Sequence, residues 1–135
     1  MASGGDIFAS ENPVGFTFGD SRALNERLLG LVRAGKKTAT CGARRDFQED
    51  GEPMPVVGRQ DIALDWDGKP ALRIETVEVT IRRFCDVPED FALAEGEGDF
   101  EEWKTGHIAF FTRNGGFDPE MELVCERFRL VEVLA

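Results

Sequence analysis

The sequence predicts an α+β fold built on a small, mainly antiparallel β-barrel with flanking helices. Apolar spacing indicates the order strand, helix, several strands, two helices and strand, which is typical of α+β domains. Two of the longer strand candidates switch their inward-facing positions in mid-course, as strands do where a sheet bends to close. With 135 residues and 41% hydrophobic content, the chain can form one core but not two. We therefore expect a single domain over residues 14–135, preceded by a flexible segment over residues 1–13.

The first elements are a short strand over residues 14–18 and an amphipathic helix over residues 21–34. Asp20 or Ser21 can cap the helix by accepting a hydrogen bond from its first free amides. Gly35 suits the left-handed position that ends a helix. The inward face of the helix is marked by residues at helical spacing, namely Leu24, Leu28, Leu31 and Val32.

A polar loop over residues 46–58 is long enough to suggest a function beyond connection. It leads into a predicted hairpin, in which the turn signal Asp67-Gly68 joins a strand over residues 61–66 to a longer strand from Pro70. Apolar positions on the longer strand change parity, from Leu72 and Ile74 to Val77, Val79 and Ile81. We therefore expect a bulge or sharp bend near Thr76.

The second half ends with two helices and a strand. A short helix is expected over residues 88–95, with Pro88 in its first turn. Asp99 and Glu102 have the spacing of a capping box, so a longer helix begins there and ends at the NGG of residues 114–116. Residues 122–133 also change parity, which predicts a long curved strand.

The formal net charge of −10 is unevenly distributed along the chain. Between Glu26 and Asp46 there are six Lys and Arg residues and no acid, so the remainder carries −16. Residues 86–102 contain eight acids and no Lys or Arg. The two charged segments can pair with each other, meet across a cleft or lie in solvent. This distribution argues against an extended nucleic-acid surface and leaves room for a nucleoside or a short RNA at one positive cleft.

The chain lacks the signals of a secreted or membrane protein. No apolar run approaches the roughly 20 residues of a membrane helix, and the first residues do not form a signal peptide. Cys41, Cys85 and Cys125 are too scattered for a disulfide framework or a zinc ribbon. We expect a cytoplasmic protein with no membrane association, no metal and no cofactor. The alternative is a zinc site that joins these cysteines to the only histidine, His107.

Thr40 is a candidate nucleophile. With no suitable histidine nearby, its base could be a lysine held neutral by burial and by neighbouring positive charge. In a regular strand Lys36 shares a face with Thr40, whereas Lys37 does so only if the chain turns between them. The alternative interpretation of KKTAT is a helix exit with two exposed lysines, followed by the start of a strand.

Two further groups could take part in chemistry. Glu95 and Glu97 flank a glycine, which lets the backbone approach a ligand while a carboxylate moves a proton or orients water. Alternatively, one carboxylate lies at a helix end and the other in solvent. Trp103 and His107 lie four residues apart on a helix, so they could stack on a base or simply belong to the core.

Several segments in order resemble ASCH-domain proteins. They are GKKTAT, PVVG, DIALDWDGKPALRIETVEVTIRRF, FALAEGEGDFEEWKTGHIAFF and VCERFRL, and together they extend over residues 16–133. ASCH domains are similar in fold to the RNA-binding PUA domains, so the resemblance implies a PUA-like barrel with flanking helices. EGEGD and the W-x-x-x-H helix resemble a longer, poorly characterised branch related to the N(4)-acetylcytidine amidohydrolases.

Those amidohydrolases use a lysine, a threonine and a glutamate. Their G-x-K-T-x-T motif is matched by Gly35, Lys37, Thr38 and Thr40. The resemblance therefore implies Lys37 as base and Thr40 as nucleophile, and the A-E-x-E pattern at residues 94–97 implies Glu97 as the catalytic glutamate. The chain departs from the pattern at Gly42, where the amidohydrolases have an arginine.

We expect a metal-independent hydrolase of an amide on a modified pyrimidine nucleoside, with Lys37, Thr40 and Glu97 as catalytic residues. The substrate-binding candidates are Lys36, Arg44, Arg45, Glu95, Trp103 and His107. One alternative is an RNA-binding module or ribonuclease, in which the basic residues contact phosphates and an aromatic residue stacks on a base. Another is a sensor of a nucleoside or RNA ligand that has no turnover.

Overall fold

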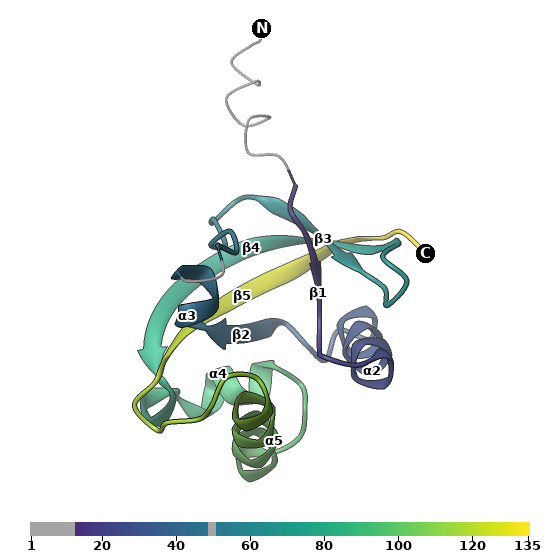
Figure 1. Cartoon of the computed structure of the whole chain (residues 1–135). Helices are drawn as coiled ribbons and strands as arrows, with labels where there is room; N and C mark the ends of the chain where they lie inside the picture. Colours follow the sequence, from purple (N-terminus) through teal and green to yellow (C-terminus); the bar gives the residue numbers. More distant parts are fainter. Residues whose placement is uncertain (1–12, 49–50) are drawn as a thin grey trace, which may run out of the picture.

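The computed structural model describes residues 13–48 and 51–135, so residues 1–12 of the expected flexible segment lie outside the described part. In chain order the elements are β1 (Gly15–Thr17), α2 (Arg22–Arg33), β2 (Ala39–Ala43), α3 (Arg44–Gln48), β3 (Gln60–Leu64), β4 (Pro70–Arg83), the 3-10 helix η1 (Phe84–Asp86), α4 (Glu89–Ala94), α5 (Phe100–Arg113) and β5 (Glu122–Val133), labelled as in Figure 1. The predicted α+β class is confirmed. The short helix α3 was not expected, because its residues fall where the polar loop was predicted to begin.

The strands form one mixed sheet in the order β1-β3-β4-β5-β2. All neighbouring pairs are antiparallel except β1 and β3, which are parallel. The sheet curls strongly, but β1 and β2 are its two edges and do not pair within the described residues (Figure 1). A cavity lined by Phe16 of β1 and Gly42 of β2 lies between these edges. The predicted barrel is therefore not confirmed, because the sheet stays open where the cavity separates its edges.

Helix α2 follows the sequence prediction closely. Ser21 is its N-cap and accepts a hydrogen bond from the amide of Leu24. Gly35, with φ of 77°, lies just beyond its end. The predicted inward face packs on the sheet through Leu28 and Val32, which are buried.

The predicted irregularity in β4 is confirmed. The register between β4 and β5 shifts between Thr76 and Glu78. The side chains beyond the shift do not turn inward as expected, since Val77 and Ile81 are exposed. Strand β3 begins at Gln60, opposite Glu75, so the second half of β4 has β5 as a neighbour on one side and no β3 on the other.

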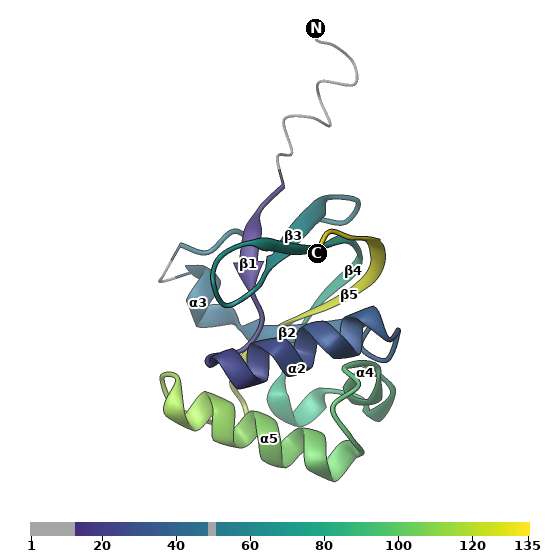
Figure 2. The same ribbon diagram turned by 90° about the vertical axis from the view of Figure 1, so that its right-hand side faces the viewer.

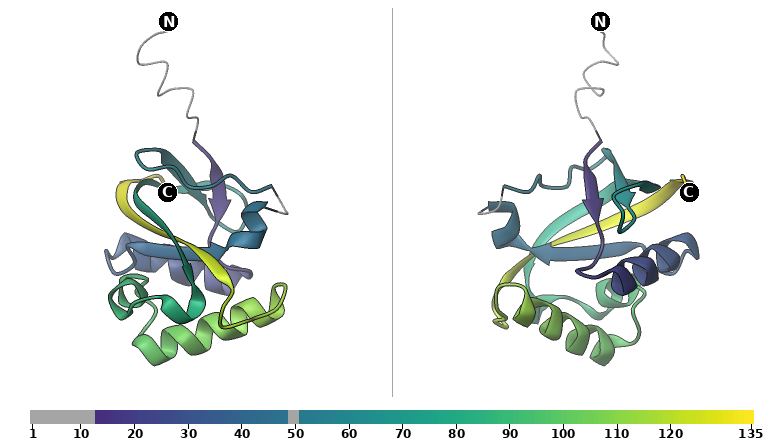
Figure 3. Two further views of the ribbon diagram at one scale, coloured as in Figure 1. Left: turned by 90° about the vertical axis from the view of Figure 1, so that its left-hand side faces the viewer. Right: turned by 45° about the vertical axis from the view of Figure 1, so that its right-hand side comes forward.

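Helices α4 and α5 lie beneath the sheet on the same side as α2, and α2 and α5 run one above the other (Figures 2 and 3). The capping box at the start of α5 is confirmed, because Asp99 and Glu102 each accept a hydrogen bond from the other's backbone amide. Trp103 and Phe111 pack α5 against α4 and the lower sheet. Two buried clusters result, one between α2 and the sheet and one between α5 and the sheet, and strand β2 runs near their boundary.

Candidate functional site

Lys37 lies between α2 and β2, and its side chain is buried. After Gly35, the backbone amides of Lys36 and Lys37 both donate to the carbonyl of Leu31, at 2.9 and 3.1 Å. The chain therefore turns sharply at the helix exit. As a result Lys37 points inward with 2% of its surface exposed, whereas Lys36 is exposed. The spacing of the sequence left the choice between these lysines open, and burial distinguishes them.

The acidic loop after α4 is held against this segment by backbone contacts. The amide of Thr38 donates to the carbonyl of Ala94 at 2.8 Å. Gly96 has φ of 75°, and a Cβ at this position would overlap the carbonyl oxygen of Lys36. Only glycine combines this backbone conformation with so close an approach. The glycine between the two glutamates thus lets the basic and acidic segments meet.

The ammonium of Lys37 lies between two carboxylates. Its Nζ is 3.2 Å from Oε1 of Glu95 and 3.1 Å from Oε2 of Glu97. Burial disfavours the charged amine, but these carboxylates outweigh burial and raise the pKa of Lys37. The expectation that neighbouring positive charge would hold this lysine neutral is therefore wrong, because its immediate neighbours are anions.

Glu95 is 1% exposed and is surrounded by donors. The indole Nε1 of Trp103 donates to its Oε2 at 3.0 Å, and Nε2 of His107 lies 3.5 Å from its Oε1. Burial alone would raise the pKa of Glu95, but Lys37 and His107 lower it to about 2. Glu95 is thus an ionised anchor for three side chains.

Trp103 belongs to the core, with 1% of its surface exposed. Phe84 and His107 stack on it, with ring centroids 5.3 and 4.4 Å away. Trp103 therefore presents no free face on which a base could stack. The Nδ1 of His107 lies 2.8 Å from the carbonyl of Trp103, and since a carbonyl only accepts, Nδ1 carries a proton. Burial works against a charged imidazole, yet Glu95 raises the pKa of His107.

A cavity of about 270 Å³ lies between α2, β2 and α5, and Lys37, Thr40 and Glu97 all line it. Phe18 and Phe110 supply apolar walls, and His107 and the exposed Arg27 also line it. Thr40 accepts or donates no side-chain hydrogen bond among the described residues. Its hydroxyl therefore has no side-chain or backbone partner in the described part of the chain.

A second cavity of about 360 Å³ adjoins the first at Thr40 and Cys41. Glu126 of β5 and the ion pair between Arg59 and Asp61 line it. The hydroxyl of Thr76 donates to Oε2 of Glu126 at 2.6 Å. Burial raises the pKa of Glu126, and Asp61 adds to this while the Thr76 hydroxyl opposes it.

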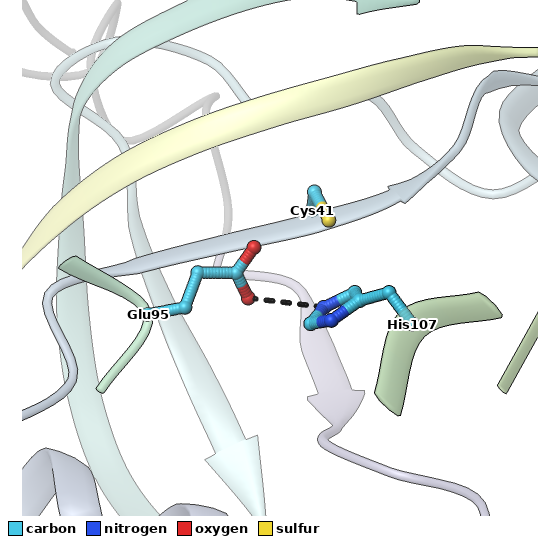
Figure 4. Close-up of side chains that lie close together, drawn as sticks. All are labelled: Cys41, Glu95 and His107. Carbon is cyan, nitrogen blue, oxygen red and sulfur yellow. Dashed lines mark ion pairs between the residues drawn. The ribbon is translucent and has the colours of Figure 1, made fainter. Parts of the chain in front are cut away.

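Cys41, Glu95 and His107 could offer three ligands to a metal ion (Figure 4). Their ligand atoms lie within 4.8 Å of one another, and zinc accepts a thiolate, a carboxylate and an imidazole. The Glu95 carboxylate, however, is already bound by Lys37 and Trp103. A cation would have to compete with the Lys37 ammonium, so these residues favour an ion-paired network over a metal centre.

The other predicted binding residues line neither of the two cavities that meet at Thr40. Lys36 is exposed beside the helix exit. Arg44 pairs with Glu122 at 2.9 Å. Arg45 donates to the backbone carbonyls of Asn114 and Gly116 and thereby fixes the segment after α5. The basic stretch therefore divides between Lys37 and Arg27 at the cavity, the exposed Lys36, and arginines that stabilise surface structure.

Sequence reasoning missed Glu126 and Arg27. Glu126 lies in a strand of alternating acidic, basic and apolar residues, where nothing marks one acid as shielded from solvent. Arg27 was one of six basic residues in its stretch, and only the position of α2 across the cavity from α5 places it there. A helical-wheel comparison with Leu24 and Leu28 could have shown that Arg27 borders the inward face of the helix.

Comparison with known proteins gives a consistent result. The family model described as "ASCH domain" matches residues 15–132. An ASCH domain from Lactobacillus crispatus JV V101 is 30% identical and superposes with a TM-score of 0.81, over 96% of this chain and 86% of that one. A protein from Enterococcus faecalis V583 is 33% identical with a TM-score of 0.82, over 95% of this chain and 88% of that one.

A point variant of the Zymomonas mobilis ASCH protein is 9% identical, with a TM-score of 0.54 over 90% of this chain and 72% of that one, and therefore supports the fold alone. No curated protein sequence matches the chain. Among residues 13–48 and 51–135, no helix has the length and apolar character needed to cross a membrane.

Proposed function

This chain belongs to the ASCH-domain family, and from that premise we propose that it hydrolyses an amide on a modified pyrimidine nucleoside such as N(4)-acetylcytidine. The observation that carries the proposal is that Lys37, Thr40 and Glu97 line one cavity. Two apolar rings, Phe18 and Phe110, line the same cavity and offer surfaces on which a pyrimidine could stack. Small-molecule sites commonly combine such walls with a few polar groups.

In this proposal the hydroxyl oxygen of Thr40 attacks the amide carbonyl and forms an acyl-enzyme. The ammonium of Lys37 stabilises the negative charge that develops on the carbonyl oxygen. Glu97, whose side chain is 16% exposed, orients the water that hydrolyses the acyl-enzyme. Lys37 therefore acts as a cation and not as the neutral base that the sequence suggested.

The test is release of acetate from N(4)-acetylcytidine. We expect the wild-type protein to be active and a Thr40→Ala variant to lose at least about 100-fold in kcat. Thr38→Ala is the matched control, because Thr38 lies two residues away with its hydroxyl directed to the carbonyl of Ala94. An inert wild type, or a Thr40→Ala variant as active as wild type, would contradict the proposal.

A second candidate is binding of a short RNA, which the family permits. Arg27 favours it, since this arginine lines two cavities and forms no ion pair with a described residue. Binding of a short single-stranded oligonucleotide would then weaken steeply with salt and would be reduced in Arg27→Gln. A sensor without turnover would instead bind N(4)-acetylcytidine and release no acetate.

A further inference from the structure

Thr40 needs a base, and Lys37 does not provide one. A hydroxyl attacks a carbonyl efficiently only if its proton is taken as the bond forms. Lys37 is held as an ammonium by two carboxylates at 3.1 and 3.2 Å, so it has no free electron pair. Glu97 lies within the same ion pair. The base must therefore be sought on the other side of β2.

Glu126 lies directly opposite Thr40 in the sheet. Strands β2 and β5 are antiparallel, and their register pairs Thr40 with Glu126. Residues opposite each other in an antiparallel pair have side chains on the same face, with Cβ atoms about 4.5–5.5 Å apart. A glutamate side chain is long enough to bring its carboxylate to a hydroxyl across that distance. Both residues line the cavity of about 360 Å³.

The carboxylate of Glu126 is partly engaged and partly open. Thr76 on β4 donates to Oε2 at 2.6 Å, which fixes the carboxylate. Its Oε1 accepts no hydrogen bond among the described residues. This oxygen is not fully buried, because Oδ1 of Asn25 is the only fully buried side-chain oxygen or nitrogen without a partner in the described residues. Catalytic hydrogen bonds are often completed only when substrate binds, so an open Oε1 on the residue opposite Thr40 in the sheet is suited to accept its proton.

The surroundings also raise the pKa of the Glu126 carboxylate, which makes it a better proton acceptor. Burial raises the pKa of Glu126, and the nearby Asp61 raises it further. Arg59 opposes this, but its guanidinium is bound to Asp61 at 2.7 Å. The charged residues that line this cavity with Glu126 are Asp20, Asp46, Glu52, Arg59 and Asp61.

We propose that Glu126 is the general base of the reaction, an inference that rests on the proposed function. Oε1 takes the hydroxyl proton of Thr40 as the bond from its oxygen to the carbonyl carbon forms. The tetrahedral intermediate then expels the amine, which receives that proton from Glu126. In the hydrolysis of the acyl-enzyme, the water oxygen attacks the acyl carbon while Glu126 takes a proton from that water. Glu126 then returns the proton to the departing Thr40 oxygen.

The decisive variants are Glu126→Gln and Thr76→Val, assayed with N(4)-acetylcytidine. Glu126→Gln is expected to lower kcat by about 10²–10⁴-fold with little change in KM, because it removes a proton acceptor and keeps the shape. Thr76→Val is expected to move the acid limb of the kcat/KM profile to higher pH. In the wild type the Thr76 hydroxyl lowers the pKa of Glu126, so its removal raises that pKa. Glu132→Gln, an exposed position on the same strand, is expected to leave both quantities unchanged.

The outcomes separate the two proposals. An inert wild type would overturn the proposed function and the base together. The second case is an active wild type and an inactive Thr40→Ala variant. In that case, a wild-type kcat in Glu126→Gln together with an unmoved acid limb in Thr76→Val would overturn only the proposal that Glu126 is the base. Thermal unfolding of each variant checks that a loss of kcat does not reflect a loss of fold.

Discussion

Glu95 and Glu126 lie on opposite sides of strand β2, and their surroundings move their pKa values in opposite directions. Burial by itself would raise the pKa of both carboxyl groups. Around Glu95 this is outweighed by Lys37 and His107, and its pKa falls to about 2. Glu126 has the hydroxyl of Thr76 and a more distant Arg59, so its pKa stays raised.

The difference shows that the charged donors, and not burial, decide the ionisation of a shielded carboxylate. A site with two carboxylates of divergent pKa has one group suited to remain charged and one suited to exchange protons. Glu95 accordingly stabilises the ion-paired network, and Glu126 is the candidate for proton transfer. The predictions below test this division by altering each side separately.

Removing the cation beside Glu95 should have the largest effect. Lys37→Met would leave Glu95 and Glu97 without their counter-ion in a buried site, and the free energy of unfolding should fall by about 3–5 kcal/mol. Urea unfolding of the purified variants measures this. Lys36→Met is the matched control, because the adjacent lysine is exposed, and it should change stability by no more than about 0.5 kcal/mol. Equal effects at the two positions would contradict the buried ion pair.

Acid should destabilise the protein through Glu95. The pKa of Glu95 falls from 4.5 to about 2 on folding, so its stabilising contribution is complete above pH 4.5 and is lost as the pH falls towards 2. The lost contribution is about 3 kcal/mol. Unfolding free energies measured across this range should decline less steeply in Glu95→Gln than in wild type. Parallel curves would show that folding does not lower the pKa of Glu95.

The close approach of the two loops depends on Gly96. Gly96→Ala would add both a strained left-handed backbone and an overlap with Lys36, so we expect the free energy of unfolding to fall by about 2 kcal/mol. Gly35→Ala has nearly the same φ but open space around its Cβ, and it should lose only about 1 kcal/mol. The difference between the two variants, from chemical unfolding, isolates the loop contact. No difference would mean that the loops can separate freely.

Glu126 should behave in the opposite way to Glu95. A raised pKa means that the folded state favours the protonated form, so Glu126 withdraws stability as the pH rises through its pKa. Glu126→Gln does not titrate, and its amide oxygen can still accept from Thr76. Its unfolding free energy at neutral pH should therefore equal or exceed that of wild type by up to about 1 kcal/mol. A marked loss of stability would assign Glu126 a structural role.

Local signals in the sequence determined much of the secondary structure. The capping box at Asp99 and the irregularity near Thr76 were predicted correctly, and Ser21 was one of the two predicted caps of α2, because each feature depends on neighbouring residues or on strand periodicity. The charge distribution along the sequence also showed a basic and an acidic segment that could pair, meet across a cleft or lie in solvent. The resemblance to ASCH-domain proteins indicated Lys37, Thr40 and Glu97 as candidate catalytic residues.

Only the tertiary structure decided the roles of these residues. Whether the sheet closes depends on contacts between β1 and β2, which are remote in sequence and separated by a cavity. The charge of Lys37 depends on carboxylates about sixty residues away, and the register of β5 against β2 alone brings Glu126 opposite Thr40. Ionisation is set by desolvation and by the sum of nearby charges in space. The order of residues along the chain fixes neither quantity until the chain has folded.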